Sequence, residues 1–396
     1  MSIAKRMSSL SPSLTLAISA KAKAMKQAGE SVISFSVGEP DFNTPDYIIQ
    51  AAKDALDSGK TKYTASSGLP ELRKAICRKL KDDNGLDYEP SQIIVSNGAK
   101  HSIFNVLYAL VDPGDEVIIP SPYWLTYPEV VRVVGGVPVF VQGNKENNYK
   151  MTAEQLTAAV TSRTKLLILN SPSNPTGAVY SETELRSIAA VCERFGIYVL
   201  SDEIYEKLIY GTARHFSIAA VSKRMKELTV VVNGVSKTYA MTGWRLGYLA
   251  APFEIAKAID SFQSHATSNA CSITQYATLA ALSADSEAVT AMRQAFNSRR
   301  DVMLKMIEDA NMECMHPEGA FYVMLKVSDL YGKSHDGMLM QTSVDFANTL
   351  LVAKKVALVP GEAFGAPEFV RLSYALSMED LKEGMARIAA FVSECR

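Results

Sequence analysis

The stretch VVVNGVSKTYAMTGWR, from Val230 to Arg245, decides much of the fold and chemistry of this 396-residue chain. An apolar run typical of a buried strand ends in small polar residues, which place Lys237 between Ser236 and Thr238. A lysine at the mouth of a buried strand can be desolvated, which lowers its pKa and makes a neutral, nucleophilic amine available for Schiff-base chemistry. Arg245, eight residues further on, suggests that a phosphate is held nearby. The alternative is a lysine that ends a strand in solvent, and on this stretch alone that alternative is favoured.

The composition is that of a globular protein with two domains. A length of 396 residues exceeds what one core usually contains, and 47% hydrophobic with 21% charged content is ordinary for a globular chain. The 41 basic and 42 acidic residues nearly cancel, so we expect neither a nucleic-acid partner nor a membrane surface. The N-terminus has no continuous apolar segment of the secretory type, and no apolar run approaches the length of a membrane span.

Cysteine and histidine are both scattered. The five cysteines include no C-x-x-C motif, which predicts reduced thiols in the cytoplasm and argues against a disulfide framework. The five histidines are equally dispersed, and H-E-x-x-H does not occur. We therefore expect no metal site.

Short apolar runs alternate with helical stretches between residues 90 and 250. The runs are rich in Val, Ile and Leu and mostly lack polar alternation, as expected of strands covered on both faces: 92–95, 116–119, 137–141, 165–169, 198–200, 229–232 and 246–250. Helical periodicity is found at 101–110, 182–195 and 218–226. This alternation predicts an α/β domain with a largely parallel sheet.

A smaller α+β domain is predicted past residue 283. A long helical stretch at 286–311 leads to an apolar segment at 320–326 and then to 369–376, which alternates like a strand with one ligand-facing side. The N-terminal segment, residues 1–44, is expected to pack with this domain. The predicted organisation is therefore a large domain at 45–283 and a small C-terminal domain at 284–396.

Polar residues collect where predicted strands end, which is where open α/β sheets bind ligands. Small residues at 96–100 open a helix whose bare N–H groups suit a phosphate, although a plain turn needs the same residues. Asn174 is fixed by two prolines and a glycine; it can donate to a phenolic oxygen or close an Asx turn. Asp202 ends an apolar run, so its carboxylate needs a partner such as a pyridinium nitrogen, unless it caps a helix. Tyr205, three residues later, can reach a hydroxyl group on the same pyridinium ring.

Three more residues are candidates for ligand binding. Trp124 can stack on an aromatic cofactor, although a core tryptophan is the better interpretation of this residue alone. Arg371, flanked by apolar residues on a strand, suits bidentate capture of a carboxylate, and an edge-strand arginine facing water is equally consistent. Gly38 could bring bare backbone close to the same carboxylate.

In their order along the chain, these features resemble the class I pyridoxal-phosphate aminotransferases of fold type I, and in particular their bacterial-type aspartate aminotransferase branch. The similarity runs nearly end to end and rests on the motifs SVGEPDF (36–42), GKTKYTASSGLPELR (59–73), SPYWLTYPE (121–129), NSPSNPTGAVY (170–180), SDEIYE (201–206), SKTYAMTGWRLGY (236–248), GAFYV (319–323), VPGEAFG (359–365) and VRLSYA (370–375). The resemblance implies a three-layer α/β fold with a mostly parallel central sheet, plus the smaller α+β domain.

The resemblance also implies a role for each candidate residue. Lys237 would form the Schiff base with pyridoxal 5'-phosphate and then shuttle a proton. Asp202 would pair with the pyridine nitrogen, Trp124 would lie over the ring, and the ring hydroxyl would be held by Asn174 and Tyr205. The phosphate would be bound by Gly98, Ala99, Lys100, Ser236 and Arg245, with Tyr63 reaching it from the second subunit of a homodimer. The substrate α-carboxylate would be bound by Arg371, Gly38, Trp124 and Asn174, and an acidic substrate side chain by Lys100 and Thr15.

The implied activity is ping-pong transfer of an amino group from L-aspartate to 2-oxoglutarate, giving oxaloacetate and L-glutamate. The second arginine used by animal-type enzymes has no equivalent that we can identify, so a preference for dicarboxylates rests on weaker grounds than transamination itself. Prephenate or aromatic transamination is an alternative on the same scaffold, and a C–S lyase is a more remote one. A DNA-binding regulator is disfavoured because the chain has neither a DNA-binding extension nor excess positive charge.

Overall fold

The computed structural model describes residues 3–4, 7, 10, 14–284 and 287–396, with the backbone alone at 14–17. Within these ranges seven strands form one sheet, in the order β2-β8-β7-β6-β5-β3-β4. Their bounds are β2 (Ile93–Ser96), β3 (Glu116–Ser121), β4 (Val137–Gln142), β5 (Thr164–Asn170), β6 (Tyr198–Asp202), β7 (Thr229–Gly234) and β8 (Gly247–Ala250). Strand β8 runs antiparallel to its neighbours β2 and β7, and the other pairs are parallel. The prediction of a mostly parallel α/β sheet is confirmed.

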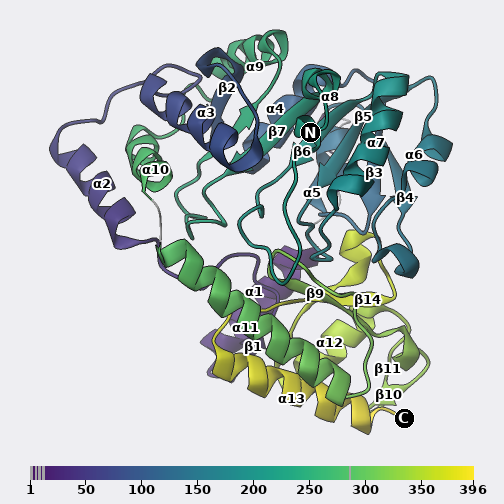
Figure 1. Ribbon diagram of the computed structural model, residues 1–396. Coiled ribbons are helices and arrows are strands. Elements are labelled where there is room, and N and C mark those ends of the chain that lie inside the picture. The colour runs from purple at the N-terminus through teal and green to yellow at the C-terminus, as the bar shows by residue number, and fades with distance from the viewer. Residues whose placement is uncertain (1–2, 5–6, 8–9, 11–13, 285–286) are drawn as a thin grey trace.

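Helices cover both faces of this sheet (Figure 1). On one face α4 (Ala99–Leu110), α5 (Thr126–Val133) and α9 (Phe253–Ala266) enclose an apolar core that includes Ile103, Leu107 and Ile259. On the other face α6 (Ala153–Ala159), α7 (Glu182–Phe195) and α8 (Lys223–Leu228) enclose a second core. A third core lies beneath α2 (Asp46–Asp57), α3 (Pro70–Asn84) and α10 (Ser272–Ser283), against β2 and β8. Strands buried on both sides explain the continuous apolar runs in the sequence.

Local sequence signals set the helix ends. Helix α7 begins with a capping box, in which Ser181 and Glu184 bond each other's backbone N–H groups, and it ends at Gly196 with a φ of 66°. The predicted helix at 218–226 is wrong in detail: a 3₁₀ turn covers Ile218–Ala220, and α8 begins afresh after Ser222. The reason is that the Ser222 hydroxyl accepts a hydrogen bond from the backbone N–H of Met225, which caps a new helix.

The C-terminal region is built around a three-stranded antiparallel sheet of order β13-β14-β9. Its strands are β9 (Tyr322–Lys326), β13 (Val359–Pro360) and β14 (Phe369–Ser373), and its helices are α11 (Glu287–Asp309), α12 (Ser343–Lys354) and α13 (Met378–Glu394). A short hairpin joins β10 (Ser334–His335) to β11 (Met338–Leu339). The long helix predicted at 286–311 and the strand predicted at 369–376 are observed, the strand being somewhat shorter than expected, and the apolar segment at 320–326 contains β9.

Residues 14–34 lie among these C-terminal elements in Figure 1. Helix α1 (Leu14–Gln27) is followed by β1 (Ile33–Ser34), which pairs in parallel with β12 (Val356–Ala357). Phe35 is fully buried and its backbone N–H donates to the carbonyl oxygen of Ala357 at 2.7 Å. The domain boundaries at residues 44 and 283 stay a prediction.

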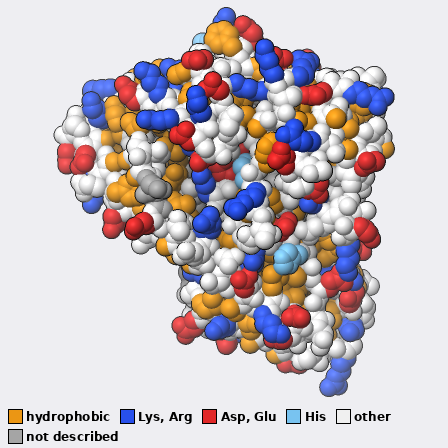
Figure 2. Space-filling model, in the orientation of Figure 1, with side chains coloured by type: hydrophobic (Ala, Val, Ile, Leu, Met, Phe, Trp, Pro, Cys, Tyr) orange, Lys and Arg blue, Asp and Glu red, His pale blue; other side chains and the backbone are white. Residues whose placement is uncertain are grey.

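Acidic and basic side chains are interspersed over the face of the molecule shown in Figure 2, as the net charge of −1 leads one to expect. Among the described helices, none combines the length and the apolar character needed to cross a bilayer.

Candidate active site

A cavity of about 550 Å³ opens where strands β5, β6 and β7 end, between the large sheet and the C-terminal region. Eleven of the predicted site residues line it: Gly38, Ala99, Lys100, Trp124, Asn174, Asp202, Tyr205, Ser236, Lys237, Arg245 and Arg371. Gly98 lies directly behind, against Arg245. Tyr63 is outside the cavity and 91% exposed. Thr15 belongs to α1, and its side chain lies outside the described residues.

Lys237 follows β7 and points its amine into the cavity. Its Nζ donates to the backbone carbonyl oxygen of Gly38 at 2.5 Å and lies 5.8 Å from the ring centroid of Tyr205. Burial lowers the pKa of Lys237 to about 8; Glu39 opposes this effect, and Arg371 adds to it. Lys237 therefore faces the cavity, and its lowered pKa is the property that the sequence led us to expect of a Schiff-base lysine.

Asp202 ends β6 and is 3% exposed. Its Oδ2 accepts a 2.7 Å hydrogen bond from the Tyr127 hydroxyl, and its Oδ1 accepts a 3.3 Å bond from the backbone N–H of Ile204. Burial raises the pKa of Asp202 to about 6 in spite of these two donors and of Lys237. Across the described chain this carboxylate forms no ion pair, so it has unused capacity for a cation.

Arg371 lies in the middle of β14 and is 4% exposed. Its Nη1 donates to Oδ1 of Asn174 at 2.9 Å, and its Nη2 donates to the carbonyl oxygen of Ser36 at 3.3 Å. Its Nε is buried without a partner, and the guanidinium forms no ion pair with any described carboxylate. Burial lowers the pKa of Arg371. A buried cation of this kind is suited to a carboxylate ligand, and the water-facing alternative is excluded.

A cradle for an anion lies at the start of α4. Gly98 caps this helix with a φ of 89°, and a Cβ built on it would come within 2.5 Å of Nη2 of Arg245. The guanidinium of Arg245 is held by a 2.9 Å bond from Nη1 to the carbonyl oxygen of Thr242. A second cation, Lys100, lies over the Trp124 ring at 4.8 Å, and burial followed by the Arg245 charge lowers its pKa. Two cations at a helix N-terminus favour a phosphate.

The sequence did not reveal two tyrosines of this site. Tyr127, three residues after Trp124 in the SPYWLTYPE motif, bonds Asp202 and meets the Trp124 ring edge-on at 5.4 Å. Tyr322, in the GAFYV motif, has its hydroxyl 3.0 Å from that of Tyr205. Both tyrosines belong to quoted motifs, but the motifs gave no signal of which partners they reach.

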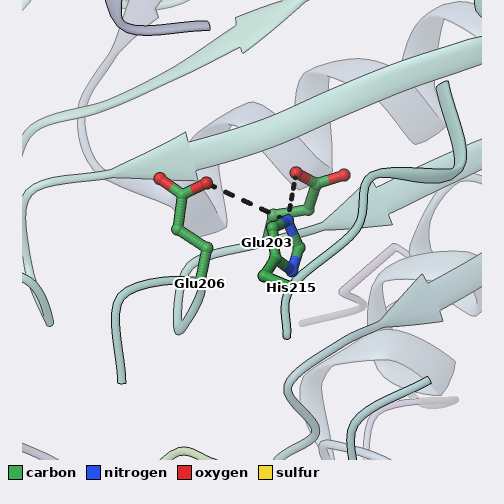
Figure 3. Close-up of side chains that lie close together, drawn as sticks. All are labelled: Glu203, Glu206 and His215. Atoms are coloured by element: carbon green, nitrogen blue, oxygen red, sulfur yellow. Dashed lines mark hydrogen bonds and ion pairs between the residues drawn. The ribbon is translucent and has the colours of Figure 1, made fainter. Parts of the chain in front are cut away.

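A polar cluster adjoins the site in sequence and is formed by the buried Glu203 and Glu206 with the partly buried His215 (Figure 3). His215 Nε2 lies 3.0 Å from Glu203 and 3.9 Å from Glu206, and its pKa is raised by these carboxylates against the effect of burial. The Lys79 ammonium bonds Glu206 directly, so that the pKa of this buried carboxyl is lowered to about 2. The donor set would suit a metal ion, but Lys79 and His215 already balance the two carboxylates. Because Glu203 follows Asp202 and Glu206 follows Tyr205, the cluster anchors the site residues to α3.

The chain that carries this amine, carboxylate, guanidinium and anion cradle is similar in sequence and in structure to known proteins. The model of the family "Aminotransferase class I and II" matches residues 30–388, and the chain belongs to this family, which uses pyridoxal phosphate. The aspartate aminotransferase of Geobacillus stearothermophilus is 50% identical over 396 residues, covering 99% of each chain. The probable aspartate/prephenate aminotransferase of Aquifex aeolicus is 48% identical over 99% of each chain. The crystal structure of the aspartate aminotransferase from Rhizobium meliloti superposes with a TM-score of 0.96, at 43% identity and with full coverage of both chains.

The residues present fit that cofactor. The buried carboxylate of Asp202, with its raised pKa, needs the positive charge that a pyridinium nitrogen brings. The space beside Gly98 is one that a Cβ would fill, next to Arg245. The lowered pKa of Lys237 suits an amine that must react with an aldehyde.

Proposed function

We propose that this chain is an aspartate aminotransferase, which transfers the amino group of L-aspartate to 2-oxoglutarate with pyridoxal 5'-phosphate as cofactor and yields oxaloacetate and L-glutamate. The observation that carries this proposal is that one cavity holds the desolvated amine of Lys237, the buried carboxylate of Asp202 and the buried, unpaired guanidinium of Arg371. Support for the substrate comes from relatives named aspartate aminotransferase at 48–50% identity over nearly the full length.

When bound, pyridoxal phosphate supplies an aldehyde for the amino group and a protonated ring that accepts electron density from the substrate α-carbon. We assign the ring nitrogen to Asp202, whose negative charge keeps that nitrogen protonated. Asn174 and Tyr205 would hold the ring hydroxyl, and Trp124 would cover the ring. The phosphate would be held by residues that line or adjoin the cavity: Gly98, Ala99, Lys100, Ser236 and Arg245.

Arg371 binds the substrate α-carboxylate together with Asn174, Gly38 and Trp124. Binding gives the buried guanidinium the anionic partner that it lacks, so the substrate is oriented by a charge-assisted contact. Once the amino group of the substrate has displaced Lys237 from the cofactor, the freed Lys237 Nζ would accept the α-proton of the substrate. The lowered pKa favours the neutral amine that this step requires.

Lys100 and Thr15 are proposed to bind the acidic side chain of the substrate. Lys100 lies on the cavity wall, and its cationic neighbour Arg245 strengthens the local positive potential. Prephenate, which is a larger dicarboxylate, is the second candidate substrate. Three relatives at 45–48% identity bear aspartate/prephenate aminotransferase names, and this observation favours it.

We also propose a homodimer in which Tyr63 completes the phosphate site of the second copy. The Tyr63 side chain is 91% exposed in the single chain, and an exposed aromatic side chain of this kind is suited to be covered by a partner subunit. The domain division at residues 1–44, 45–283 and 284–396 and a cytoplasmic location are further parts of the proposal; the unpaired state of the five cysteines supports the latter.

A panel of donors and acceptors tests the activity. L-Aspartate and L-glutamate are each paired with oxaloacetate, 2-oxoglutarate, prephenate and phenylpyruvate, and kcat/KM is measured for each pair. We expect the aspartate and 2-oxoglutarate pair to rank first. A higher value for prephenate would replace the proposed substrate, and release of pyruvate from cysteine conjugates without an acceptor would indicate a lyase.

Hybrid dimers test the shared site. Lys237→Ala and Tyr63→Ala chains are each expected to be weakly active, and a dissociated and reassociated equal mixture should recover about a quarter of wild-type activity, because one of the two sites of each hybrid is intact. A mixture no more active than its components contradicts the sharing of Tyr63.

A further inference from the structure

Tyr322 lies between the guanidinium of Arg371 and the hydroxyl of Tyr205. In the antiparallel pair of β14 and β9, Arg371 is opposite Met324, so Tyr322 is the diagonal neighbour of Arg371 on the same face of the sheet. The Arg371 guanidinium carbon lies 4.3 Å from the Tyr322 ring centroid. The Tyr322 hydroxyl lies 3.0 Å from that of Tyr205. All three side chains are less than 5% exposed, and they line the same cavity.

The surroundings of these three residues favour one of the two possible donors in the hydrogen bond between Tyr322 and Tyr205. Burial raises the pKa of Tyr322, but Arg371 and the hydrogen bond shared with Tyr205 lower it. Burial raises the pKa of Tyr205 well above its usual range, and the proximity of Tyr322 raises it further. The Arg371 guanidinium lies 4.3 Å from the Tyr322 ring centroid, and this positive charge favours Tyr322 as the hydrogen-bond donor. When the Tyr205 hydroxyl is engaged by an acceptor in the cavity, Tyr322 donates to Tyr205.

We propose that Tyr322 is a positioning residue that links the carboxylate site at Arg371 to the cofactor through Tyr205. This inference rests on the proposed function. The Tyr322 hydroxyl donates to the Tyr205 oxygen. This bond orients the Tyr205 O–H toward the ring hydroxyl of the cofactor and makes it a stronger donor. The Tyr322 ring contacts the Arg371 guanidinium and holds it in place.

This link has a direction. A carboxylate bound to Arg371 cancels the positive charge that makes Tyr322 a strong donor, so Tyr205 becomes a weaker donor in turn. With pyridoxal phosphate bound, this weaker donation from Tyr205 would leave more negative charge on the ring oxygen, and the Lys237 nitrogen would hold its proton more tightly. Binding of a carboxylate at Arg371 therefore raises the proton affinity of the Lys237 nitrogen.

A spectrophotometric pH titration of the purified holoenzyme tests the link. The midpoint of the absorbance change of the Lys237-bound cofactor is compared in wild type, Tyr322→Phe, Tyr205→Phe and the double variant. We expect Tyr322→Phe to raise the midpoint by a few tenths of a pH unit to about one unit, which is about two- to tenfold in proton affinity. The double variant should titrate like Tyr205→Phe alone, because Tyr322 acts through Tyr205.

Maleate, a dicarboxylate with no amino group to exchange, probes the Arg371 end of the link. Its dissociation constant should stay within about twofold of wild type in Tyr322→Phe and rise about tenfold in Tyr322→Leu, which loses the ring that covers the guanidinium. Maleate should also raise the titration midpoint of the wild type more than that of Tyr322→Phe. Because Tyr322→Leu also lacks the hydroxyl, its titration midpoint should rise as that of Tyr322→Phe does.

Tyr374→Phe is the matched control. Tyr374 is also a fully buried tyrosine of the C-terminal region, and its hydroxyl bonds the backbone of Ala320 rather than the site, so its loss should leave the midpoint unchanged. An unchanged midpoint in the Tyr322 variants, or additive shifts in the double variant, would overturn the inference. A wild-type protein without the chromophore would instead overturn the proposed function.

Discussion

The hydroxyl of Tyr127 donates a 2.7 Å hydrogen bond to Oδ2 of Asp202, and both residues are at most 3% exposed. The carboxylate that is proposed to face the cofactor nitrogen is thus oriented from behind by a neutral donor on α5. A bond of this kind favours the ionised carboxylate without cancelling its charge, which stays available to the cavity.

Removing this donor should weaken cofactor binding. In Tyr127→Phe the buried carboxylate loses a hydrogen bond, which costs about 1.5–3 kcal/mol for a charged acceptor, so we expect the dissociation constant of pyridoxal phosphate to rise about ten- to a hundredfold. Equilibrium dialysis of the apoenzyme measures it. Tyr123→Phe is the control, since the Tyr123 ring stacks on Phe140 at 4.8 Å and Tyr123 does not line the cavity. Equal affinities of Tyr127→Phe and wild type would exclude this role.

The cofactor-free protein should gain stability when Asp202 is neutralised. Burial raises the pKa of Asp202 in the folded protein to about 6 from its ordinary value of 3.8. The buried charge therefore disfavours the folded state once the pH exceeds 6 and has no effect below about 4. Apo Asp202→Asn should therefore unfold with a free energy about 1–3 kcal/mol higher than wild type at about pH 8, and the difference should vanish near pH 4. Urea unfolding across this range measures it. A difference that does not change with pH would show that the charge is not its cause.

Loss of Arg371 should act on substrate binding. Arg371→Ala leaves a bound carboxylate without its buried partner, which costs about 3–5 kcal/mol, so kcat/KM for amino acids should fall about 10²- to 10³-fold or more, mostly through KM. Steady-state kinetics measure both constants. Arg300→Gln is the control, because Arg300 pairs with Asp301 and lies over Tyr210, away from the cavity. An unchanged KM removes Arg371 from the site.

The pH dependence of cofactor uptake reports the state of Lys237. With a pKa lowered to about 8, the neutral amine is the major form above pH 8 and falls about tenfold for each pH unit below it. The rate at which the apoenzyme forms its chromophore should rise from about pH 6.5 and level off above about pH 8. Stopped-flow absorbance follows it. A rate that continues to rise toward pH 10 would mean that the amine has the pKa of an ordinary lysine.

The strands and the residues at their ends could be predicted from the sequence, because strands buried on both faces leave continuous apolar runs. Asp202 ends such a run, and Asn174 and Lys237 follow others within a few residues. The contacts of Tyr127 and Tyr322 could not be predicted in this way, because their partners are 75 and 117 residues away in the chain and depend on how α5 and β9 pack. The helix at 218–226 was misjudged because its apolar spacing continues across the Ser222 cap.

The proposed function depends on a covalent bond between the ε-amino group of Lys237 and pyridoxal phosphate. The most direct test is to reduce the yellow holoenzyme with borohydride, digest it and identify the modified peptide by mass spectrometry. We predict a pyridoxyl group on Lys237 alone, together with loss of chromophore and turnover in Lys237→Ala. A colourless protein that takes up no cofactor, a modification on a different lysine, or normal turnover by Lys237→Ala would contradict it.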